Sequence, residues 1–208
     1  MIEVRNGRTI LTTPVSESDL ARLRIGDVFY LDGELATGRD SVHERTVYEG
    51  KDLPVDIRDK VLMHAGPIVK QTEVGGREMI SIGPTTSMRM EKYEYDLVKA
   101  TGVRVIVGKG GMGPSTAAAC RDFGAIHCVM PAGNAVVGAV CTEEILGGHW
   151  LDLGMPEAVW HCRVRELGPL IVTIDTSGRN YFEEKKTEYD RIRREQTELI
   201  SKQVHFTK

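Results

Sequence analysis

The chain is poor in aromatic residues and has no surplus of basic ones. Of its 208 residues, 6% are aromatic, and 27 Lys and Arg stand against 30 Asp and Glu, for a formal net charge of -3. Proteins that bind nucleic acid need surplus Lys and Arg for the phosphates, and many stack bases on aromatic side chains. The composition therefore argues against a nucleic-acid partner.

Long apolar runs are also missing. No segment approaches the roughly 18 apolar residues of a transmembrane helix, and the first residues lack the apolar stretch of a signal peptide. We therefore expect no membrane partner and a cytoplasmic location. Because 41% of the residues are hydrophobic, the chain can bury one sizeable core. We expect a single domain over residues 1–208.

The few cysteines do not form a metal motif. No two of the four lie at the short spacing of a zinc knuckle. They are Cys120, Cys128, Cys141 and Cys162. We expect reduced, mostly buried thiols and no metal site within this chain.

Apolar and polar residues alternate in a pattern typical of an α/β protein. Strands are expected over residues 9–14, 28–35, 60–69, 79–82, 103–107, 125–130, 159–164 and 170–175, with a hairpin tip over 71–78. The strand over 60–69 is expected to be broken at Gly66-Pro67. Helices are expected over 16–23, 41–49, 91–100, 115–123, 135–139 and 142–146. The strand–helix–strand order from 103 to 130 favours parallel crossovers. Residues 181–208 are expected to form a charged helical tail.

The most informative segment is the loop Gly83-Pro84-Thr85-Thr86-Ser87-Met88-Arg89-Met90. If the loop enters a helix, Thr85 and Arg89 share one face. Thr85 then lies near a helix start, where free N–H groups favour an anion. Arg89 adds a planar fork that can hold a carboxylate by two hydrogen bonds. A capping threonine beside a solvated arginine is the alternative.

A second loop, Gly108-Lys109-Gly110-Gly111-Met112-Gly113, follows an apolar strand. Lys109 can stabilise developing negative charge or donate to a carboxylate, and Gly110 lets the backbone approach a ligand closely. The alternative is a lysine that extends from a turn into solvent. The loop matches neither a Walker motif nor a dinucleotide fingerprint, which argues against nucleotide binding.

A third cluster, Arg39-Asp40 with His43, follows the strand expected over 28–35. Arg39 can hold a second carboxylate, with Asp40 orienting it. His43 can act as a general acid or base, or as an orienting group. A salt-bridged helix start is the alternative. His64 lies in an apolar strand, where core packing is the favoured interpretation.

Thr, Arg and Lys side chains beside Gly-rich backbone are typical of a pocket for a small, multiply charged anion. No complete catalytic set is present in the chain. The residues alone therefore leave two functions open, half of an enzyme active site and a non-catalytic domain that binds a dicarboxylate or assists assembly.

Several of these segments occur together in the β subunits of the class I fumarase and L(+)-tartrate dehydratase family, which the chain resembles along nearly its whole length. The matching segments are 11–14, 26–31, 37–40 with His43, 64–67, 83–90, 108–113, 131–133 and 153–156. Ser87-Met88 and Gly168-Pro169-Leu170 favour the tartrate branch over the fumarase branch.

The resemblance implies a three-layer swivelling β/β/α domain that works with a larger α subunit, in an α2β2 assembly. That α subunit would hold a 4Fe–4S cluster through three cysteines. The implied activity is that of a hydro-lyase dehydrating L(+)-tartrate to oxaloacetate, with fumarate hydration to malate as the alternative.

The resemblance also implies roles for individual residues. Thr85 would be the catalytic base, activated by an acidic residue of the α subunit. Arg39, Arg89 and Lys109 would contact the substrate's carboxylates and hydroxyl, with Gly110 beside them. Asp40, His43 and Thr86 would support the site.

Overall fold

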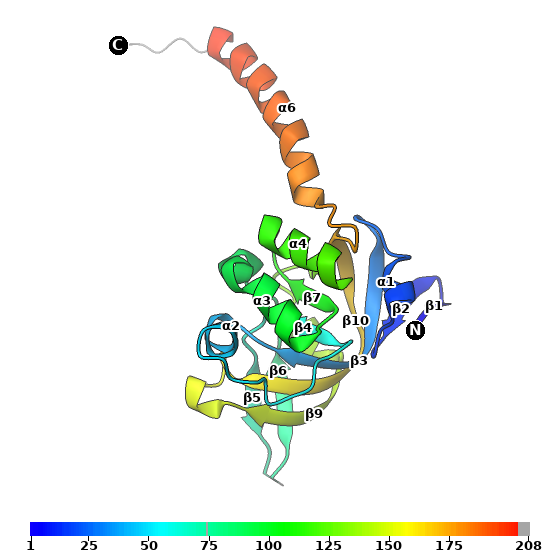
Figure 1. Cartoon of the computed structure of the whole chain (residues 1–208), viewed down its shortest axis with the longest axis vertical. Helices are drawn as coiled ribbons and strands as arrows, with labels where there is room; N and C mark the ends of the chain where they lie inside the picture. Colours follow the sequence, from blue (N-terminus) through cyan, green and yellow to red (C-terminus); the bar gives the residue numbers. More distant parts are fainter. Residues whose placement is uncertain (74, 204–208) are drawn as a thin grey trace.

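The computed structural model of the chain describes residues 1–73 and 75–203, and it is a mixed α/β structure (Figure 1). Its strands are β1 (Ile2–Arg5), β2 (Arg8–Thr12), β3 (Val28–Thr37), β4 (Val61–Met63), β5 (Ile68–Gln71), β6 (Arg77–Ser81), β7 (Val105–Gly108), β8 (Ile126–Val129), β9 (Thr142–His149) and β10 (Val159–Ile174). Its helices are α1 (Glu17–Leu20), α2 (Asp40–Val47), α3 (Glu91–Thr101), α4 (Pro114–Phe123), α5 (Ala135–Val140) and α6 (Tyr181–Gln203), with 3₁₀ turns at η1 (Ser87–Met90) and η2 (Leu151–Leu153).

The main sheet has eight strands in the order β1-β2-β3-β4-β7-β8-β10-β9. Strands β2, β3, β4, β7 and β8 are parallel neighbours, as the strand–helix–strand pattern predicted. The long strand β10 pairs antiparallel with both β8 and β3. Strands β3, β4, β7, β8 and β10 therefore form a closed ring, in which each strand pairs with the next and β10 pairs with β3.

Alternate residues of the central strands enter two separate apolar clusters. Val61 and Met63 of β4 enter the cluster that also contains Val69 of β5 and Met79 of β6. Leu62 lies between them in sequence and enters the cluster that contains Leu97 of α3. Helices α2, α3 and α4 cover that second face, with α3 in the middle (Figure 1).

Helices α3 and α4 begin and end within a residue or two of their predicted bounds, because both carry strong local signals. Gly102 and Gly124 follow them with φ of 71° and 64°, the left-handed conformation that ends many helices. At the other end of α4, the Glu91 carboxylate accepts hydrogen bonds from the backbone N–H groups of Gly113 and Ser115, each at 2.8 Å. It also accepts from the Thr116 hydroxyl at 2.6 Å.

Two sequence predictions need correction. Residues 142–146, predicted as a helix, begin strand β9, which pairs with β10 from Thr142 onward. The expected strands over 159–164 and 170–175 form one strand, β10, whose register shifts around Leu167. The break predicted at Gly66-Pro67 is present, and it separates β4 from β5, which belong to different sheets. Short apolar runs lack the length that separates a helix from a strand.

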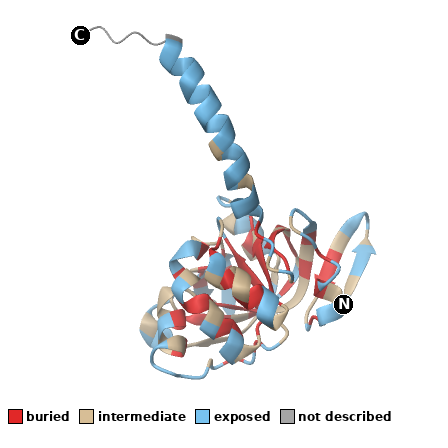
Figure 2. Ribbon diagram, turned by 45° about the horizontal axis from the view of Figure 1, so that its top comes forward, coloured by how far each residue is buried: buried red, intermediate tan, exposed pale blue. Residues whose placement is uncertain are grey.

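The charged tail is helical, as predicted, and α6 projects from the body as an exposed rod (Figures 1 and 2). Residues 204–208 of that predicted tail, and residue 74 of the predicted hairpin tip, lie outside the described residues. Within the described part of the chain, no helix is both long and apolar enough to cross a membrane.

All four cysteines are free thiols, and three of them are buried. Burial raises the pKa of the Cys162 thiol to about 12. The prediction of reduced, mostly buried cysteines is confirmed.

Candidate functional site

The predicted site residues lie at the carboxyl edge of three adjacent parallel strands. Arg39 follows β3 after one glycine, His64 follows β4 directly, and Lys109 follows β7 directly. The carboxyl ends of neighbouring parallel strands meet at one edge of a sheet, where ligand sites of α/β folds commonly form. The topology therefore brings loops that are far apart in sequence to one place.

Main-chain hydrogen bonds fix the Thr85 loop between the ends of β4 and β7. The Thr85 N–H donates to the His64 carbonyl at 2.6 Å, and the Lys109 N–H donates to the Thr85 carbonyl at 3.0 Å. The Ser87 N–H donates back to the Lys109 carbonyl at 3.0 Å, and Thr86 pairs with Lys109 as an isolated parallel bridge. Thr85, Thr86 and Lys109 are thus held in one frame.

These bonds also correct one expectation about the loop. The 3₁₀ turn begins only at Ser87 and α3 at Glu91, so Thr85 precedes the helix rather than starting it. The N–H groups of Thr85 and Ser87 already donate to carbonyls. An anion at this loop therefore depends on side-chain donors rather than on these two N–H groups.

Two positions of the Lys109 loop require glycine, each for a different structural reason. A Cβ on Gly108 would lie 1.8 Å from Ser87 Oγ, so only glycine lets the two segments approach this closely. Gly110 has a φ of 75°, a left-handed conformation that other residues rarely adopt. The predicted close approach of backbone is present at Gly108, and Gly110 turns the exposed loop that follows Lys109.

Arg89 joins the Thr85 loop to the Arg39 loop. Its Nε and Nη2 donate to the two carboxylate oxygens of Asp40 at 3.0 and 2.9 Å, and Nη2 also donates to Thr85 Oγ1 at 3.1 Å. The sequence interpretation gave Asp40 the task of orienting Arg39, and that was wrong. Partial burial would raise the pKa of the Asp40 carboxyl, but the hydrogen bonds it accepts from Arg89 and from the backbone, together with the charges of Arg89 and Arg39, outweigh burial and lower that pKa.

Arg39 has a different carboxylate partner. Its Nε lies 3.1 Å from Glu157, in the turn before β10, and the guanidinium packs against Gly66. A Cβ at position 66 would lie 2.5 Å from Arg39 Nη1, so glycine leaves the space that the guanidinium fills. The side chain of Arg39 is 25% exposed and that of Arg89 is 42% exposed, so both reach solvent.

The site keeps donors available for an anion. Arg89 uses Nε and Nη2, and its Nη1 donates to no described residue. Lys109 is exposed, and among the described residues its ammonium has no carboxylate within ion-pair distance. Guanidinium and ammonium groups beside a hydroxyl can bind carboxylates and stabilise negative charge.

His43 is fully buried in α2 and does not reach this surface. Its N–H and its ring Nδ1 both contact the Arg39 carbonyl, at 3.0 and 2.8 Å. Of the two roles left open by the sequence, direct acid–base catalysis requires contact with the substrate. Burial therefore favours the orienting role.

His64 is buried, as expected for a core residue, but its surroundings are polar. Its Nδ1 lies 3.0 Å from Ser87 Oγ, and its Nε2 lies 3.3 Å from Glu94 of α3. Glu94, Ser87 and Glu157 were missed by the sequence analysis. Glu94 had a detectable signal, since it falls on the apolar face of α3 with Met90, Leu97 and Val98.

Comparisons with known proteins identify the family of the chain. The sequence model of the family described as Fumarase C-terminus matches residues 3–185. The chain belongs to that family. It is 48% identical over 202 residues to the L(+)-tartrate dehydratase subunit beta of Escherichia coli K12, covering 97% of this chain and 100% of the relative.

Two further relatives extend the Fumarase C-terminus family match. The chain is 37% identical over 174 residues to a Geobacillus stearothermophilus protein with the provisional name fumarate hydratase class I, covering 84% of this chain and 33% of the relative. It is also 37% identical over 183 residues to a Methanocaldococcus jannaschii protein provisionally named L(+)-tartrate dehydratase subunit beta, covering 86% of this chain and 93% of the relative.

The iron–sulfur chemistry of class I fumarate hydratases does not fit the residues of this chain. Such clusters are held by cysteine thiolates. Within residues 1–73 and 75–203, the group of His, Cys, Asp and Glu side chains close enough to share a metal ion is His43, His64 and Glu94, which includes no cysteine. Three of the four thiols are buried in the apolar clusters.

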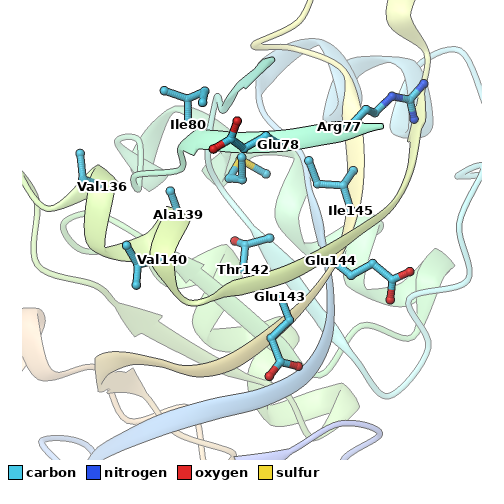
Figure 3. A pocket seen from close by; sticks show the side chains of 11 residues that line it. Arg77, Glu78, Ile80, Val136, Ala139, Val140, Thr142, Glu143, Glu144 and Ile145 are labelled. Carbon is cyan, nitrogen blue, oxygen red and sulfur yellow. The ribbon is translucent and has the colours of Figure 1, made fainter. Parts of the chain in front are cut away.

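A cavity of about 460 Å³ lies between β6, α5 and β9 (Figure 3). Ala139 of α5 and Ile145 of β9 point toward β6. The charged residues that line it are three glutamates and one arginine. They are Glu78, Glu143, Glu144 and Arg77. An acidic lining repels a dicarboxylate, so the donors at the strand-end loops are the better candidate site.

Proposed function

We propose that this chain is the β subunit of a hydro-lyase that dehydrates L(+)-tartrate to oxaloacetate. The observation that carries the proposal is the 48% identity over the full length of the E. coli L(+)-tartrate dehydratase subunit beta. The cluster of arginine, lysine and threonine at one sheet edge supports it, because a dicarboxylate needs two cationic contacts and its dehydration develops further negative charge.

The proposal includes a larger α subunit that holds a 4Fe–4S cluster, in an α2β2 assembly. The lack of fitting ligands in this chain supports this division. So does the G. stearothermophilus relative, because this chain matches only 33% of it. The remaining two thirds leave room in that relative for a second functional part. The cluster would supply Lewis-acid chemistry at the substrate.

In this assignment, Arg39 and Arg89 each bind one carboxylate of the substrate. Arg89 presents the unused Nη1, while Asp40 keeps the guanidinium plane fixed through two hydrogen bonds. Lys109 stabilises the negative charge that develops on the carboxylate as the adjacent C–H bond breaks, and Thr86 and Gly110 shape the loop around it. Asp40 and His43 support the two arginines without contacting the substrate.

Thr85 is proposed as the catalytic base. Arg89 donates to Thr85 Oγ1 at 3.1 Å, and a positive donor favours the negative form of that oxygen. The alkoxide takes the proton from one carbon of tartrate while hydroxide leaves the neighbouring carbon, and the acidic residue of the α subunit returns its proton to the hydroxide, which yields water and an enol. The enol then tautomerises to oxaloacetate. The proton of the Thr85 hydroxyl passes first to an acidic residue of the α subunit.

The architecture proposed for the whole chain is a single domain over residues 1–208 with the three-layer swivelling β/β/α fold. Two features support it. Helices α2, α3 and α4 form one layer over the sheet, and the pairing of β10 with both β3 and β8 folds the strands back on themselves. A swivelling domain of this kind suits an enzyme whose site closes between two subunits.

The test is co-expression with an α subunit under anaerobic conditions, followed by kinetics with L(+)-tartrate, S-malate and fumarate. Arg89→Ala and Lys109→Ala should each reduce kcat/KM by an amount equal to roughly 2–5 kcal/mol of transition-state binding. Exposed cations of α3 and α4 provide matched controls, and Lys99→Ala and Arg121→Ala should keep wild-type kinetics.

Tartrate dehydration that survives both Arg89→Ala and Lys109→Ala at saturating substrate would reject the proposed site. A wild-type complex that hydrates fumarate and ignores tartrate would reject the substrate and leave the hydro-lyase half-site in place.

A further inference from the structure

Three buried ionisable side chains meet directly beneath the strand-end loops. They are His43 of α2, His64 after β4 and Glu94 of α3, and all three are 0% exposed. His43 Nε2 lies 3.4 Å from Glu94 Oε2, and His64 Nε2 lies 3.3 Å from the same oxygen. One carboxylate oxygen therefore lies within ion-pair distance of two imidazole rings, in a site without access to bulk water, and neither ring Nε2 has a hydrogen-bond partner among the described residues.

Each histidine turns its other nitrogen to a loop of the proposed site. His43 Nδ1 lies 2.8 Å from the Arg39 carbonyl. His64 Nδ1 lies 3.0 Å from Ser87 Oγ, and the His64 carbonyl accepts from the Thr85 N–H at 2.6 Å. Since the Ser87 N–H donates to the Lys109 carbonyl, contacts from Glu94 extend to the loops of Arg39, Thr85 and Lys109.

The hydrogen-bonding capacity of these groups fixes where a proton must lie. A backbone carbonyl only accepts, so His43 Nδ1 donates to the Arg39 carbonyl and carries a hydrogen. A neutral His43 would then present a bare lone pair at Nε2 to the Glu94 carboxylate, 3.4 Å away. Two acceptors facing each other in a buried site repel, so a further positive charge has to lie between them.

The same reasoning assigns that charge to His43. Burial would raise the pKa of the Glu94 carboxyl, but the two histidines beside it outweigh burial and hold that pKa well below its usual range, so Glu94 is ionised. His64 is neutral when the Ser87 hydroxyl, 3.0 Å away, donates to its Nδ1 and its Nε2–H faces Glu94, and burial, which lowers the pKa of His64, favours that form. An imidazolium at His43 gives every polar atom facing Glu94 Oε2 a hydrogen and makes the three groups neutral in sum.

We propose that His43, His64 and Glu94 form a positioning triad, in which a proton held on His43 opposite Glu94 fixes the loops that carry Arg39, Thr85 and Lys109. The triad does not touch the substrate, and its effect on catalysis rests on the proposed function. Loss of Glu94 would leave two buried ring nitrogens without a partner, and the loops would shift to hydrate them.

The kinetic test uses the complex with the α subunit and three variants. Glu94→Ala should lower kcat/KM for L(+)-tartrate by about 100-fold, the loss expected when catalytic groups move by about 1 Å. Glu94→Gln keeps the shape and can still contact both rings, and it should restore activity to within about tenfold of wild type.

Val98→Ala is the matched control, because Val98 is buried one turn further along α3 and faces the apolar cluster instead of the triad. It should lower Tm without lowering kcat/KM. If Val98→Ala and Glu94→Ala reduce activity alike in proportion to their loss of Tm, the triad has only a structural role and the proposal fails.

A second measurement is independent of activity and of the folding of Glu94→Ala. Ring ¹⁵N NMR of the full chain at pH 7 should show both nitrogens of His43 in the imidazolium range, and a neutral His43 in Glu94→Gln. A neutral His43 in the wild-type chain would overturn the proposal. So would a stoichiometric metal ion in the purified chain that Glu94→Gln removes, since the metal would then replace the proton.

The two readouts also separate this inference from the proposed function. A wild-type complex with no tartrate dehydratase activity, but with an imidazolium at His43, would reject the function and support the shared proton. Full activity in Glu94→Ala would reject the positioning role and leave the function intact.

Discussion

Arg89 and Asp40 are 49 residues apart in sequence, yet they meet through two parallel hydrogen bonds of 3.0 and 2.9 Å. The pair spans the gap between α2 and the turn before α3, and its guanidinium also donates to Thr85. A planar donor fork held by a carboxylate has few orientations left. The direction in which Arg89 presents its remaining N–H groups is therefore set by Asp40.

This relationship predicts that Asp40→Asn lowers kcat/KM of the assembled enzyme by about 10- to 100-fold, because a misoriented binding group is costly even when it is still present. Steady-state kinetics with L(+)-tartrate measures the effect. Asp122→Asn is the control, since Asp122 pairs with Arg121 on the exposed side of α4 at 2.9 Å. Equal kinetics for Asp40→Asn and wild type would contradict the prediction.

Gly108→Ala should damage both stability and activity. The added Cβ would lie 1.8 Å from Ser87 Oγ and 3.2 Å from His64 Nδ1, so the Thr85 loop would have to move. We expect a loss of roughly 1–3 kcal/mol in the free energy of unfolding, as for other overpacked sites. Urea titration monitors the loss.

A double-mutant cycle with Ser87→Gly tests the cause of the Gly108→Ala effect. Because Ser87→Gly removes the side chain that the new methyl group meets, Gly108→Ala should cost less in that background. Strict additivity of the two changes would show that the clash is not the reason.

Glu91→Ala should destabilise the chain through the start of α4. The carboxylate accepts hydrogen bonds from two backbone N–H groups and from the Thr116 hydroxyl, so it acts as a cap supplied by another helix. Loss of a helix cap typically costs about 0.5–2 kcal/mol. Urea unfolding should show a lower midpoint with an unchanged m value, and a higher midpoint would exclude the capping role.

Acid should destabilise the chain through His127. Its Nδ1 donates to Thr173 Oγ1 at 2.6 Å, because that hydroxyl itself donates to the His127 carbonyl at 3.1 Å. Burial lowers the pKa of His127 to about 3 from an ordinary value of 6.5. The stabilisation is therefore complete above about pH 6.5 and is lost as pH falls toward 3, at up to roughly 1.4 kcal/mol per pH unit.

Urea unfolding between pH 7 and pH 4 checks this prediction. His127→Gln cannot titrate, so its free energy of unfolding should fall less steeply over that range than that of the wild-type chain, although it starts lower. Parallel slopes for the two proteins would show that His127 does not titrate on unfolding. His64, whose pKa burial also lowers, contributes to the slope that remains in both proteins.

The sequence predicted the helices that carry their own end signals and failed where partners decide the structure. Gly102 and Gly124 end α3 and α4 whatever else surrounds them. Residues 142–146 form a strand only because β10 offers a pairing edge, and that edge is not visible in a local pattern. The tail helix α6 was predictable because its pattern is local along its whole length.

The site residues divide in the same way, into those identified by local sequence and those that depend on partners from other elements. Glycine-rich loops after apolar strands identified Thr85, Arg89 and Lys109, since a loop's composition is local information. The partner of Arg89 was assigned to the wrong arginine, because Asp40 is adjacent to Arg39 in sequence while its actual contact comes from another element. Glu94 was missed because its two histidine partners come from α2 and from the end of β4.

The ring of pairings through β3 and β10 has a consequence for self-association. Of the strands of the eight-stranded sheet, the two terminal ones are β1 and β9, and both expose charged side chains, Glu3 on β1 and Glu143 and Glu144 on β9. Charges at a free strand edge discourage the addition of a strand from another molecule. These charges thereby guard the chain against aggregating with its own copies.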